Sequence, residues 1–382
     1  MPCRADDDPV RIGVLDDMSG PFAAVQGPGD VLAARMAAED FGGTVLGRPI
    51  EILPSDHQNK IDVGVAIARR WFDVGKVGVV VGLGNSGVAL AVQAIAREKN
   101  KISIVTSAGT DQLTGTDCSP NGFHWVFDTY ALAKATVTAV AARGGDSWFF
   151  VTADYAFGRA MVEQATRMIV AAGGRVVGET RHPVGTLDFS SFILQAQSSA
   201  AKVIGLANAG ADFVSSMKTA AEFGVVAKGQ SIAGTVVFLS DVHAIGLPIA
   251  QGLIFTEAFY WDQDDKTRAF SRRFEQRHGA PPTSLHAGAY SATLHYLKAV
   301  AAAGSDETGA VLAKMRELPI DDFMTEGGWI RPDGRVMRTM YLIQVKTPQE
   351  AQGEWDLLKV VATIPANDAF RPLAEGNCPL VR

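Results

Sequence analysis

Short β-rich runs alternate with helical segments of roughly 10–15 residues along most of the chain. The first series has expected strands at Val10–Leu15, Ile50–Leu53, Val77–Val81 and Ile102–Thr106, and helices at Gly29–Phe41, after a capping Asp62, and at Val88–Ala96. The second begins after residue 128, with strands at Trp148–Thr152, Val176–Glu179, Lys202–Leu206 and Gln230–Ala233, and helices at Gly158–Ala172, Phe189–Ser198 and Ala211–Phe223. Because this alternation is typical of parallel sheets with right-handed crossovers, it predicts two α/β lobes of about 120 residues each.

The segment after Gly252 no longer follows the alternating pattern. Helices are expected at Lys266–His278, Ala287–Ala303 and Thr308–Leu318, and strands at Trp329–Ile330 and Thr339–Val345 flank a turn at Arg331–Gly334. This remainder is too short for a third lobe, so we expect it to add elements to both earlier lobes. Several crossings between the lobes would then form a hinge.

The charge balance excludes some classes of partner. The chain carries 35 Lys and Arg residues against 41 Asp and Glu residues, a net charge of −6. Without a basic excess, neither nucleic acid nor an anionic membrane is an expected partner. No apolar run reaches the roughly 18–20 residues that span a bilayer, so direct membrane insertion is not expected.

The three cysteines, Cys3, Cys118 and Cys378, form no CxxC motif, and the histidines follow no ligand spacing, so no metal site is expected. Cys118 and Cys378 lie in loop-like segments. Two interpretations stay open for them: unrelated free thiols, or a disulfide that requires an oxidising compartment and leaves Cys3 as the free thiol. Met1–Arg4 has no signal-peptide pattern, so we expect the leader of an exported protein to have been removed.

The segment Gly82–Gly87 matches the G-x-G-x-x-G pattern of dinucleotide-binding proteins, between an expected strand and an expected helix. The next strand, however, ends without the acidic residue that would hold a ribose, which disfavours NAD. Backbone amides at the start of a helix, with the Ser86 hydroxyl beside them, also suit a carboxylate. Thr110, after the next strand, could hold the same carboxylate. Alternatively, Ser86 and Thr110 only cap their own helices.

Motifs for catalysis are missing from the sequence. Ser86 is not in a G-x-S-x-G motif because Val88 occupies the last position, and there is no HExxH, P-loop or EF-hand pattern. Several aromatic residues lie near expected loops, where they belong either to the core or to an apolar ligand cleft. They are Phe22, Tyr155, Phe157, Tyr260 and Trp261.

Four segments together resemble the periplasmic leucine/isoleucine/valine-binding proteins, which are type I solute-binding proteins of ABC importers. They are Ser19–Phe22, Val81–Ser86, Thr106–Thr110 and Asp154–Gly158. The resemblance covers roughly residues 9–345. It implies an α/β fold of two Rossmann-like lobes with parallel sheets, joined by a three-segment hinge that closes on a ligand. It also implies a periplasmic binding protein that uses no cofactor, is monomeric, is not an enzyme, and docks on a membrane permease.

The resemblance further implies where the lobes begin and end. The N-terminal lobe is expected to comprise residues 9–128 and 258–332, and the C-terminal lobe residues 129–257 and 333–365. In such relatives a disulfide fastens the C-terminal tail, so residues 366–382 are expected to be stapled to the N-terminal lobe by Cys118 and Cys378.

Family positions that hold the ligand carboxylate match Ser86 and Thr110, and Ala108, grouped with them, matches a position whose backbone carbonyl receives the ligand ammonium. The ammonium-binding glutamate of the family aligns near Thr235, and a tyrosine aligns near Ala209. The carboxylate anchor therefore looks kept and the ammonium anchor lost, because a buried ammonium without a carboxylate partner is unfavourable. The expected ligand walls are Phe22, Asn85, Tyr155, Phe157, Asn208, Thr235 and Trp261.

These departures predict a ligand with a carboxylate but no α-ammonium, such as a benzoate or cinnamate derivative. One alternative is a branched-chain amino acid, with Asp212 or Asp241 in place of the glutamate. Others are an NAD-dependent enzyme that uses Gly82–Gly87, and an amide-sensing regulator on the same fold.

Overall fold

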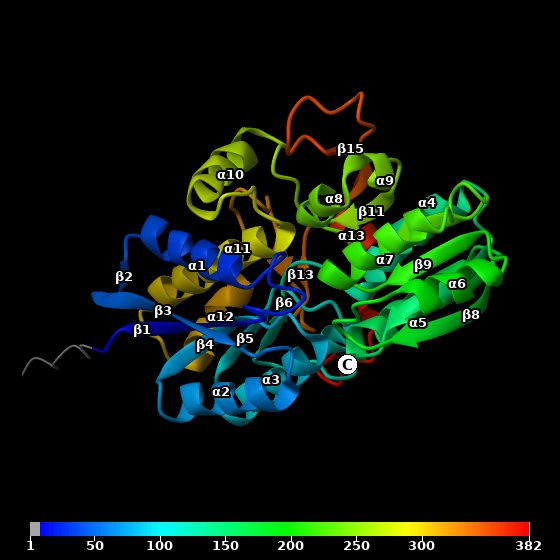
Figure 1. Cartoon of the computed structure of the whole chain (residues 1–382). Coiled ribbons are helices and arrows are strands. Elements are labelled where there is room, and N and C mark those ends of the chain that lie inside the picture. Colours follow the sequence, from blue (N-terminus) through cyan, green and yellow to red (C-terminus); the bar gives the residue numbers. More distant parts are fainter. Residues whose placement is uncertain (1–7, 382) are drawn as a thin grey trace, which may run out of the picture.

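The computed structural model describes residues 8–381, so Cys3 lies outside the described residues. Six strands form the first sheet, in the order β2-β3-β1-β4-β5-β6 (Figure 1). They are β1 (Val10–Asp16), β2 (Thr44–Val45), β3 (Arg48–Asp56), β4 (Val77–Gly82), β5 (Ile102–Val105) and β6 (Gly122–His124). All neighbours pair in parallel except β2, which runs antiparallel to β3.

Helices from two distant parts of the chain cover this first sheet. They are α1 (Pro28–Asp40), α2 (Ile61–Asp73), α3 (Ser86–Glu98), α10 (Asp265–His278), α11 (Ser284–Ala303) and α12 (Thr308–Glu317). α1 packs against α11, and α2 packs against α3 on the opposite face (Figure 1). On the α2 face, Gly13 of β1 lies so close to the Trp71 ring that a Cβ atom would overlap it. The first sheet is therefore buried on both faces, as its apolar strands require.

The second lobe is built on a four-stranded parallel sheet in the order β10-β9-β7-β8. Its strands are β7 (Ser147–Ala153), β8 (Arg175–His182), β9 (Val203–Ala207) and β10 (Ser231–Gly234). Its helices are α4 (Thr129–Ala141), α5 (Ala156–Ala171), α6 (Ser190–Ser198), α7 (Gly210–Glu222), α8 (Leu239–Ile245) and α9 (Leu247–Ala250). The order and direction of the strands confirm the expected α/β class with parallel sheets.

The last third of the chain adds two small antiparallel sheets. β11 (Ile254–Glu257), β14 (Met340–Val345) and β15 (Leu358–Ile364) form one, and β12 (Trp329–Ile330) and β13 (Val336–Met337) form the other. The Arg331–Gly334 turn thus joins β12 to β13, whereas the expected Thr339–Val345 strand pairs elsewhere as β14. Two short helical turns follow, α13 (Ala366–Ala369) and the 3-10 helix η2 (Leu373–Glu375).

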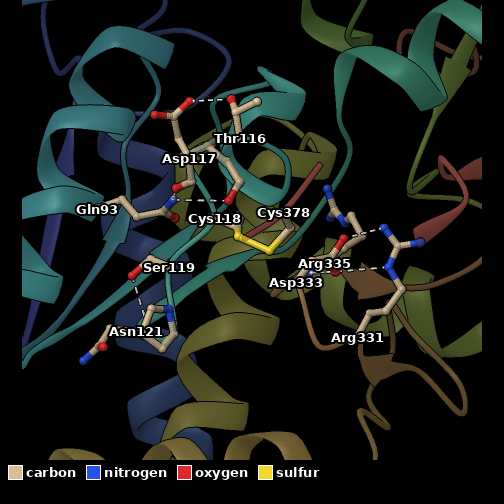
Figure 2. Close-up of a disulfide and its surroundings, with 12 residues drawn as sticks. Gln93, Thr116, Asp117, Cys118, Ser119, Asn121, Arg331, Asp333, Arg335 and Cys378 are labelled. Atoms are coloured by element: carbon tan, nitrogen blue, oxygen red, sulfur yellow. Dashed lines mark hydrogen bonds and ion pairs between the residues drawn. A yellow bond between two sulfur atoms is a disulfide. The ribbon is translucent and has the colours of Figure 1, made fainter. Parts of the chain in front are cut away.

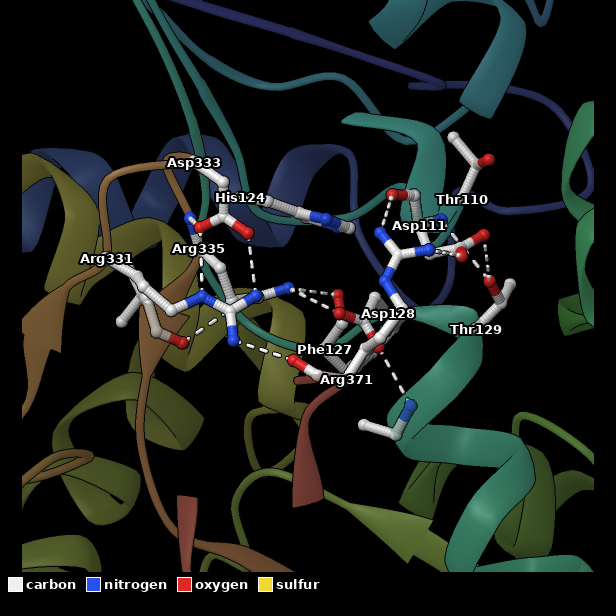
Figure 3. A network of polar contacts seen from close by, with 12 residues as sticks. Thr110, Asp111, His124, Phe127, Asp128, Thr129, Arg331, Asp333, Arg335 and Arg371 are labelled. Atoms are coloured by element: carbon white, nitrogen blue, oxygen red, sulfur yellow. Dashed lines mark hydrogen bonds and ion pairs between the residues drawn. The ribbon is translucent and has the colours of Figure 1, made fainter. Parts of the chain in front are cut away.

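Buried arginines lie where the chain passes between the lobes (Figure 3). Nη1 of Arg335 donates to the carbonyl of Phe127 at 2.9 Å and lies 3.6 Å from a carboxylate oxygen of Asp128. Arg331 forms two hydrogen bonds with the Asp333 carboxylate. Burial lowers the pKa of Arg335 to about 10, so this guanidinium stays charged at neutral pH and needs its carboxylate neighbour. The segments expected to form the hinge are therefore held by buried charged groups.

The C-terminal tail is fastened to the first lobe by a covalent bond. Cys118 and Cys378 form a disulfide across 260 residues of sequence (Figure 2). The interpretation of these two residues as free thiols is therefore wrong, and the disulfide is confirmed. The lobe boundaries at residues 128, 257, 332 and 365 stay predictions.

One carboxylate connects the tail to both lobes. Asp111 lies in the 3-10 helix η1 (Asp111–Thr114), and its side chain accepts a hydrogen bond from Arg371 of the tail at 2.7 Å. It also accepts a hydrogen bond from Thr129 of α4 at 3.0 Å (Figure 3) and one from Gln164 of α5 at 2.9 Å. Because Gln164 belongs to the second lobe, its hydrogen bond to Asp111 links the two lobes directly.

Candidate functional site

A small cavity lies between the two lobes, at the carboxyl ends of their parallel strands. Its volume is about 30 Å³. The first lobe contributes Phe22, Val25, Gln26, Gly84, Ser86, Ser107, Gly109 and Leu285; Phe127 comes from a connecting segment; and the second lobe contributes Tyr155, Phe157, Ala209, Val236 and Phe238. Most of these residues directly follow β1, β4, β5, β7, β9 and β10. Loops at the carboxyl ends of strands are where open α/β sheets bind ligands.

The loop between β4 and α3 positions the Ser86 hydroxyl at the cavity. Asn85 is the N-cap of α3, and its side chain accepts hydrogen bonds from the amides of Gly87 and Val88. Leu83 adopts the left-handed region, with φ at 66°, and its amide donates to Leu15 of β1. Ser86 Oγ accepts a hydrogen bond from the Thr110 amide at 3.3 Å, which leaves the hydroxyl proton free for a ligand.

Two buried carboxyl groups lie directly behind this part of the cavity wall. Asp16 accepts a hydrogen bond from the Gly84 amide at 2.8 Å, and Asp30 accepts one from the Ser107 hydroxyl at 2.9 Å. Burial raises the pKa of Asp30 to about 7, and burial together with the neighbouring Asp30 raises the pKa of Asp16 well above its usual value. We therefore expect the pair to share one proton at neutral pH, since two adjacent buried carboxylates do not both ionise.

Aromatic rings form the opposite side of the cavity. The Tyr155 ring lies with its centroid 6.2 Å from that of Phe22 and 5.9 Å from that of Phe157. The rings of Phe127 and Phe238 are 6.2 Å apart. Burial raises the pKa of Tyr155, so its phenol is neutral at all physiological pH values. Apart from this hydroxyl, the second lobe presents only apolar side chains to the cavity.

Four of the residues expected at the site line the cavity: Phe22, Ser86, Tyr155 and Phe157. The other six are not among its lining residues: Asn85, Ala108, Thr110, Asn208, Thr235 and Trp261.

Three of these six have backbone or cap functions beside the cavity. The Ala108 carbonyl is hydrogen-bonded to His124 at 2.8 Å, and the Thr110 side chain caps η1 by accepting from the Gln112 amide. Asn85 caps α3, as described above. The alternative that Ser86 only caps its helix is wrong, because the N-cap of α3 is Asn85. The prediction that Asp62 caps α2 is also wrong, because the N-cap of that helix is Lys60.

The remaining three lie in the second lobe or beyond it. Thr235 donates to the Leu206 carbonyl at 2.9 Å, and the Asn208 amide contacts His182 and Ser216. Trp261 lines a different surface depression, where its indole donates to the Trp355 carbonyl at 3.1 Å. Trp261 is therefore not a wall of this cavity, because its side chain lies in the other depression.

No Asp or Glu side chain is among the cavity-lining residues in the described range 8–381. Asp212 instead accepts hydrogen bonds from the Gly185 amide, and Asp241 accepts one from the Phe238 amide at 3.0 Å. Neither carboxylate is placed to replace the glutamate of the amino-acid binders. Within the same range, no group of three or more potential metal ligands occurs, and no helix has the length and apolar character needed to cross a membrane.

Two polar cavity residues, Gln26 and Ser107, were missed by the sequence interpretation. Gln26 lies in the loop after β1 and Ser107 in the loop after β5. Their position after a strand was the only feature of the sequence that could have indicated a place at the cavity. The Gln26 side chain lies against Gly84, where a Cβ atom would overlap its amide group. This packing also argues against the dinucleotide alternative, because a pyrophosphate must approach the glycine backbone that Gln26 covers.

The model of the family described as periplasmic binding protein matches residues 9–353. The chain belongs to the periplasmic binding protein family. A periplasmic binding protein from Burkholderia mallei has 46% sequence identity, with a TM-score of 0.96 over 98% of this chain and 100% of its own. The expected family and fold are therefore confirmed.

Two further solved structures are similar to this chain. One is a branched-chain amino acid ABC transporter periplasmic ligand-binding protein from Burkholderia xenovorans, 41% identical, with a TM-score of 0.86 over 98% of this chain and 100% of its own. The other is an ABC transporter solute-binding protein from R. palustris in complex with benzoate, which is 22% identical, with a TM-score of 0.85 over 94% of this chain and 97% of its own. A comparison with curated proteins finds no match.

Membership of this family settles the general activity. The chain is the solute-binding protein of an ABC importer, and its family consists of binding proteins without catalytic activity. The cavity between the lobes is accordingly interpreted as a binding site for a small molecule, and the NAD-dependent enzyme alternative is abandoned.

Proposed function

We propose that this periplasmic binding protein captures a small aromatic carboxylate, such as a benzoate or cinnamate derivative, and presents it to a membrane permease. The observation that carries the proposal is the unequal distribution of polar groups in the cavity. The polar side chains Gln26, Ser86 and Ser107 lie on the first lobe, and the second lobe is aromatic and aliphatic apart from the Tyr155 hydroxyl. A flat molecule with one anionic end matches this division.

The first lobe supplies what an anionic head group needs. The Ser86 hydroxyl has a free proton because its oxygen accepts from the Thr110 amide. Ser86 is also the first residue of α3, whose N-terminal end favours negative charge. The cavity-lining residues include no Asp or Glu within residues 8–381, so an α-ammonium would lack a direct carboxylate partner.

The second lobe supplies the contacts that would favour closure. A cavity of about 30 Å³ has room for about one water molecule, so a benzoate-sized ligand requires the walls to move apart. Because the walls belong to two lobes, opening at the hinge provides that space and closure brings Tyr155 and Phe157 onto the ligand ring. The disulfide fits an oxidising compartment such as the periplasm.

A branched-chain amino acid is the second candidate. It is favoured by the 41% identity to the Burkholderia xenovorans protein described as a branched-chain amino acid transporter component. Ser107 donates its hydroxyl proton to Asp30 behind it, so the Ser107 oxygen could accept a hydrogen bond from a ligand amine. The amine would then contact a carboxylate only through a hydroxyl, which is weaker than a direct ion pair.

Isothermal titration calorimetry distinguishes the two candidates. The wild-type protein is refolded after denaturation to remove carried-over ligand and titrated with benzoate, 4-hydroxybenzoate, cinnamate, leucine and NAD. We expect an aromatic acid to bind and to stabilise the protein by about 2.7 kcal/mol at a concentration of 100 times its Kd. Binding of leucine without binding of any aromatic acid would refute the proposal.

A further inference from the structure

Gln26 is a buried polar residue of the cavity wall, and its backbone position is fixed. Only 1% of the residue is exposed. Its amide donates to the Phe22 carbonyl at 3.2 Å, and its carbonyl lies 3.4 Å from Nε2 of His286 on α11. His286 Nδ1 accepts from the Thr283 amide, so the proton is on Nε2 and is donated to Gln26. Burial lowers the pKa of His286 to about 3, which keeps this imidazole neutral.

The side chain of Gln26, in contrast to its backbone, lacks a hydrogen-bond partner. Its Nε2 is fully buried and has no acceptor among residues 8–381. Buried side-chain amides almost always have partners, because an unsatisfied donor is costly. Two N–H donors at the edge of a ligand cavity therefore indicate that the acceptor comes from outside the chain.

The amide group is also held in a defined place. It lies on the Cα of Gly84, where a Cβ atom would overlap both Oε1 and Nε2. Glycine at this position is thus what allows the Gln26 side chain to reach the cavity. Gly84 is two residues before Ser86, so the amide group lies beside the loop that carries the free hydroxyl proton.

We propose that Gln26 is a specificity-determining residue whose side-chain amide donates a hydrogen bond to the ligand carboxylate, beside Ser86. This inference rests on the proposed function, because it assigns the acceptor to the anionic end of the ligand. A neutral amide donates to the carboxylate without adding a charge to the cavity wall. Together with the Ser86 hydroxyl, it would supply two neutral donors to the same anionic group.

Two substitutions of similar size test the donor. Gln26→Leu removes the N–H groups, and Gln26→Glu replaces them with an acidic group at the same distance from the backbone. We expect the Kd for benzoate to rise roughly 10- to 100-fold in Gln26→Leu, the range for loss of a hydrogen bond to a charged group. We expect a larger rise in Gln26→Glu, because the two carboxylates repel each other.

Benzamide provides the readout that a merely structural role would not change. Its uncharged amide can donate to a glutamate, so the preference for benzoate over benzamide should reverse in Gln26→Glu. The control is Gln195→Leu on the exposed face of α6, which should bind benzoate like the wild-type protein. Circular dichroism and thermal unfolding of each variant report whether it is folded.

The possible results separate this inference from the proposed function. If the wild-type protein binds benzoate and both Gln26 variants bind it with unchanged Kd and unchanged preference, the assignment of Gln26 is wrong. If the wild-type protein binds leucine but no aromatic acid, the proposed function fails. The same variants are then titrated with leucine, whose carboxylate requires the same donor, and an unchanged Kd again overturns the assignment.

Discussion

Removal of the Cys118–Cys378 disulfide is expected to lower the free energy of unfolding substantially. The bond closes a loop of 260 residues that includes the whole second lobe. In the chain-entropy relation, a loop of this length restricts the unfolded chain by about 5–6 kcal/mol at 25 °C. This value is an upper limit, because a compact unfolded state and local strain both reduce the effect.

The native state itself should change little, because other contacts hold the tail. Arg371 remains paired with Asp111, and Lys134 still donates to the Asp368 carbonyl. We therefore expect the double variant Cys118→Ala/Cys378→Ala to fold and bind ligand, but to unfold at a lower denaturant concentration.

Urea unfolding followed by circular dichroism and tryptophan fluorescence measures the difference. The wild-type protein is measured both oxidised and after reduction, and the double variant should resemble the reduced form. A loss of about 3 kcal/mol or more would fit the loop-closure argument. A loss below about 1 kcal/mol, with unchanged dependence on urea, would refute it and show that the tail contacts alone fix this end of the chain.

Three further predictions concern the binding site and the lobe interface. Ser86→Ala should weaken benzoate binding by about 1.5–3 kcal/mol in calorimetry without lowering the melting temperature, and unchanged affinity would remove Ser86 from the site. Gln164→Leu removes the hydrogen bond to Asp111 between the lobes. Because this hydrogen bond joins the lobes when they are closed, its loss should lower the affinity for the ligand about tenfold, mainly through faster ligand dissociation. Stopped-flow fluorescence measures the dissociation rate, and a rate equal to that of the wild-type protein would contradict the expectation. Asp30→Asn should alter the pH dependence of stability. Since the pKa of Asp30 is raised from 3.8 to about 7, the native state keeps a proton that the unfolded state releases. The wild-type protein should therefore lose stability relative to the variant between pH 4 and 7, by up to about 1.4 kcal/mol per pH unit in urea titrations, and a constant difference would exclude the raised pKa.

Most strands of the two parallel sheets were predictable, because many of them contain short apolar runs. The run at Val77–Val81 is an example, since a strand buried on both faces leaves no place for polar residues. Other elements gave no such signal. β6 has three residues, and α4 is apolar around much of its surface, so it lacks the periodicity of an amphipathic helix. β11 and β15 also escaped prediction, because their pairing depends on distant segments.

The candidate site was predictable only in part. Ser86 follows from its place at the start of a helix after a buried strand. Gln26 does not, because a single glutamine in a loop has no distinguishing pattern until the fold brings it onto Gly84. Trp261 shows the opposite error, since an aromatic residue near a loop looks the same in sequence whether it faces a cavity or the surface.

The division of the cavity between the lobes has a consequence for how solutes are sorted. Under the proposed function, an incoming molecule would meet the hydroxyl and amide groups of the first lobe while the protein is open, and its charge would be tested at that stage. Only a molecule that stayed there until the hinge closed would meet the rings of the second lobe, which would test its shape. Solutes with the wrong charge would then leave before the hinge moves, and the permease would receive only those that passed both steps.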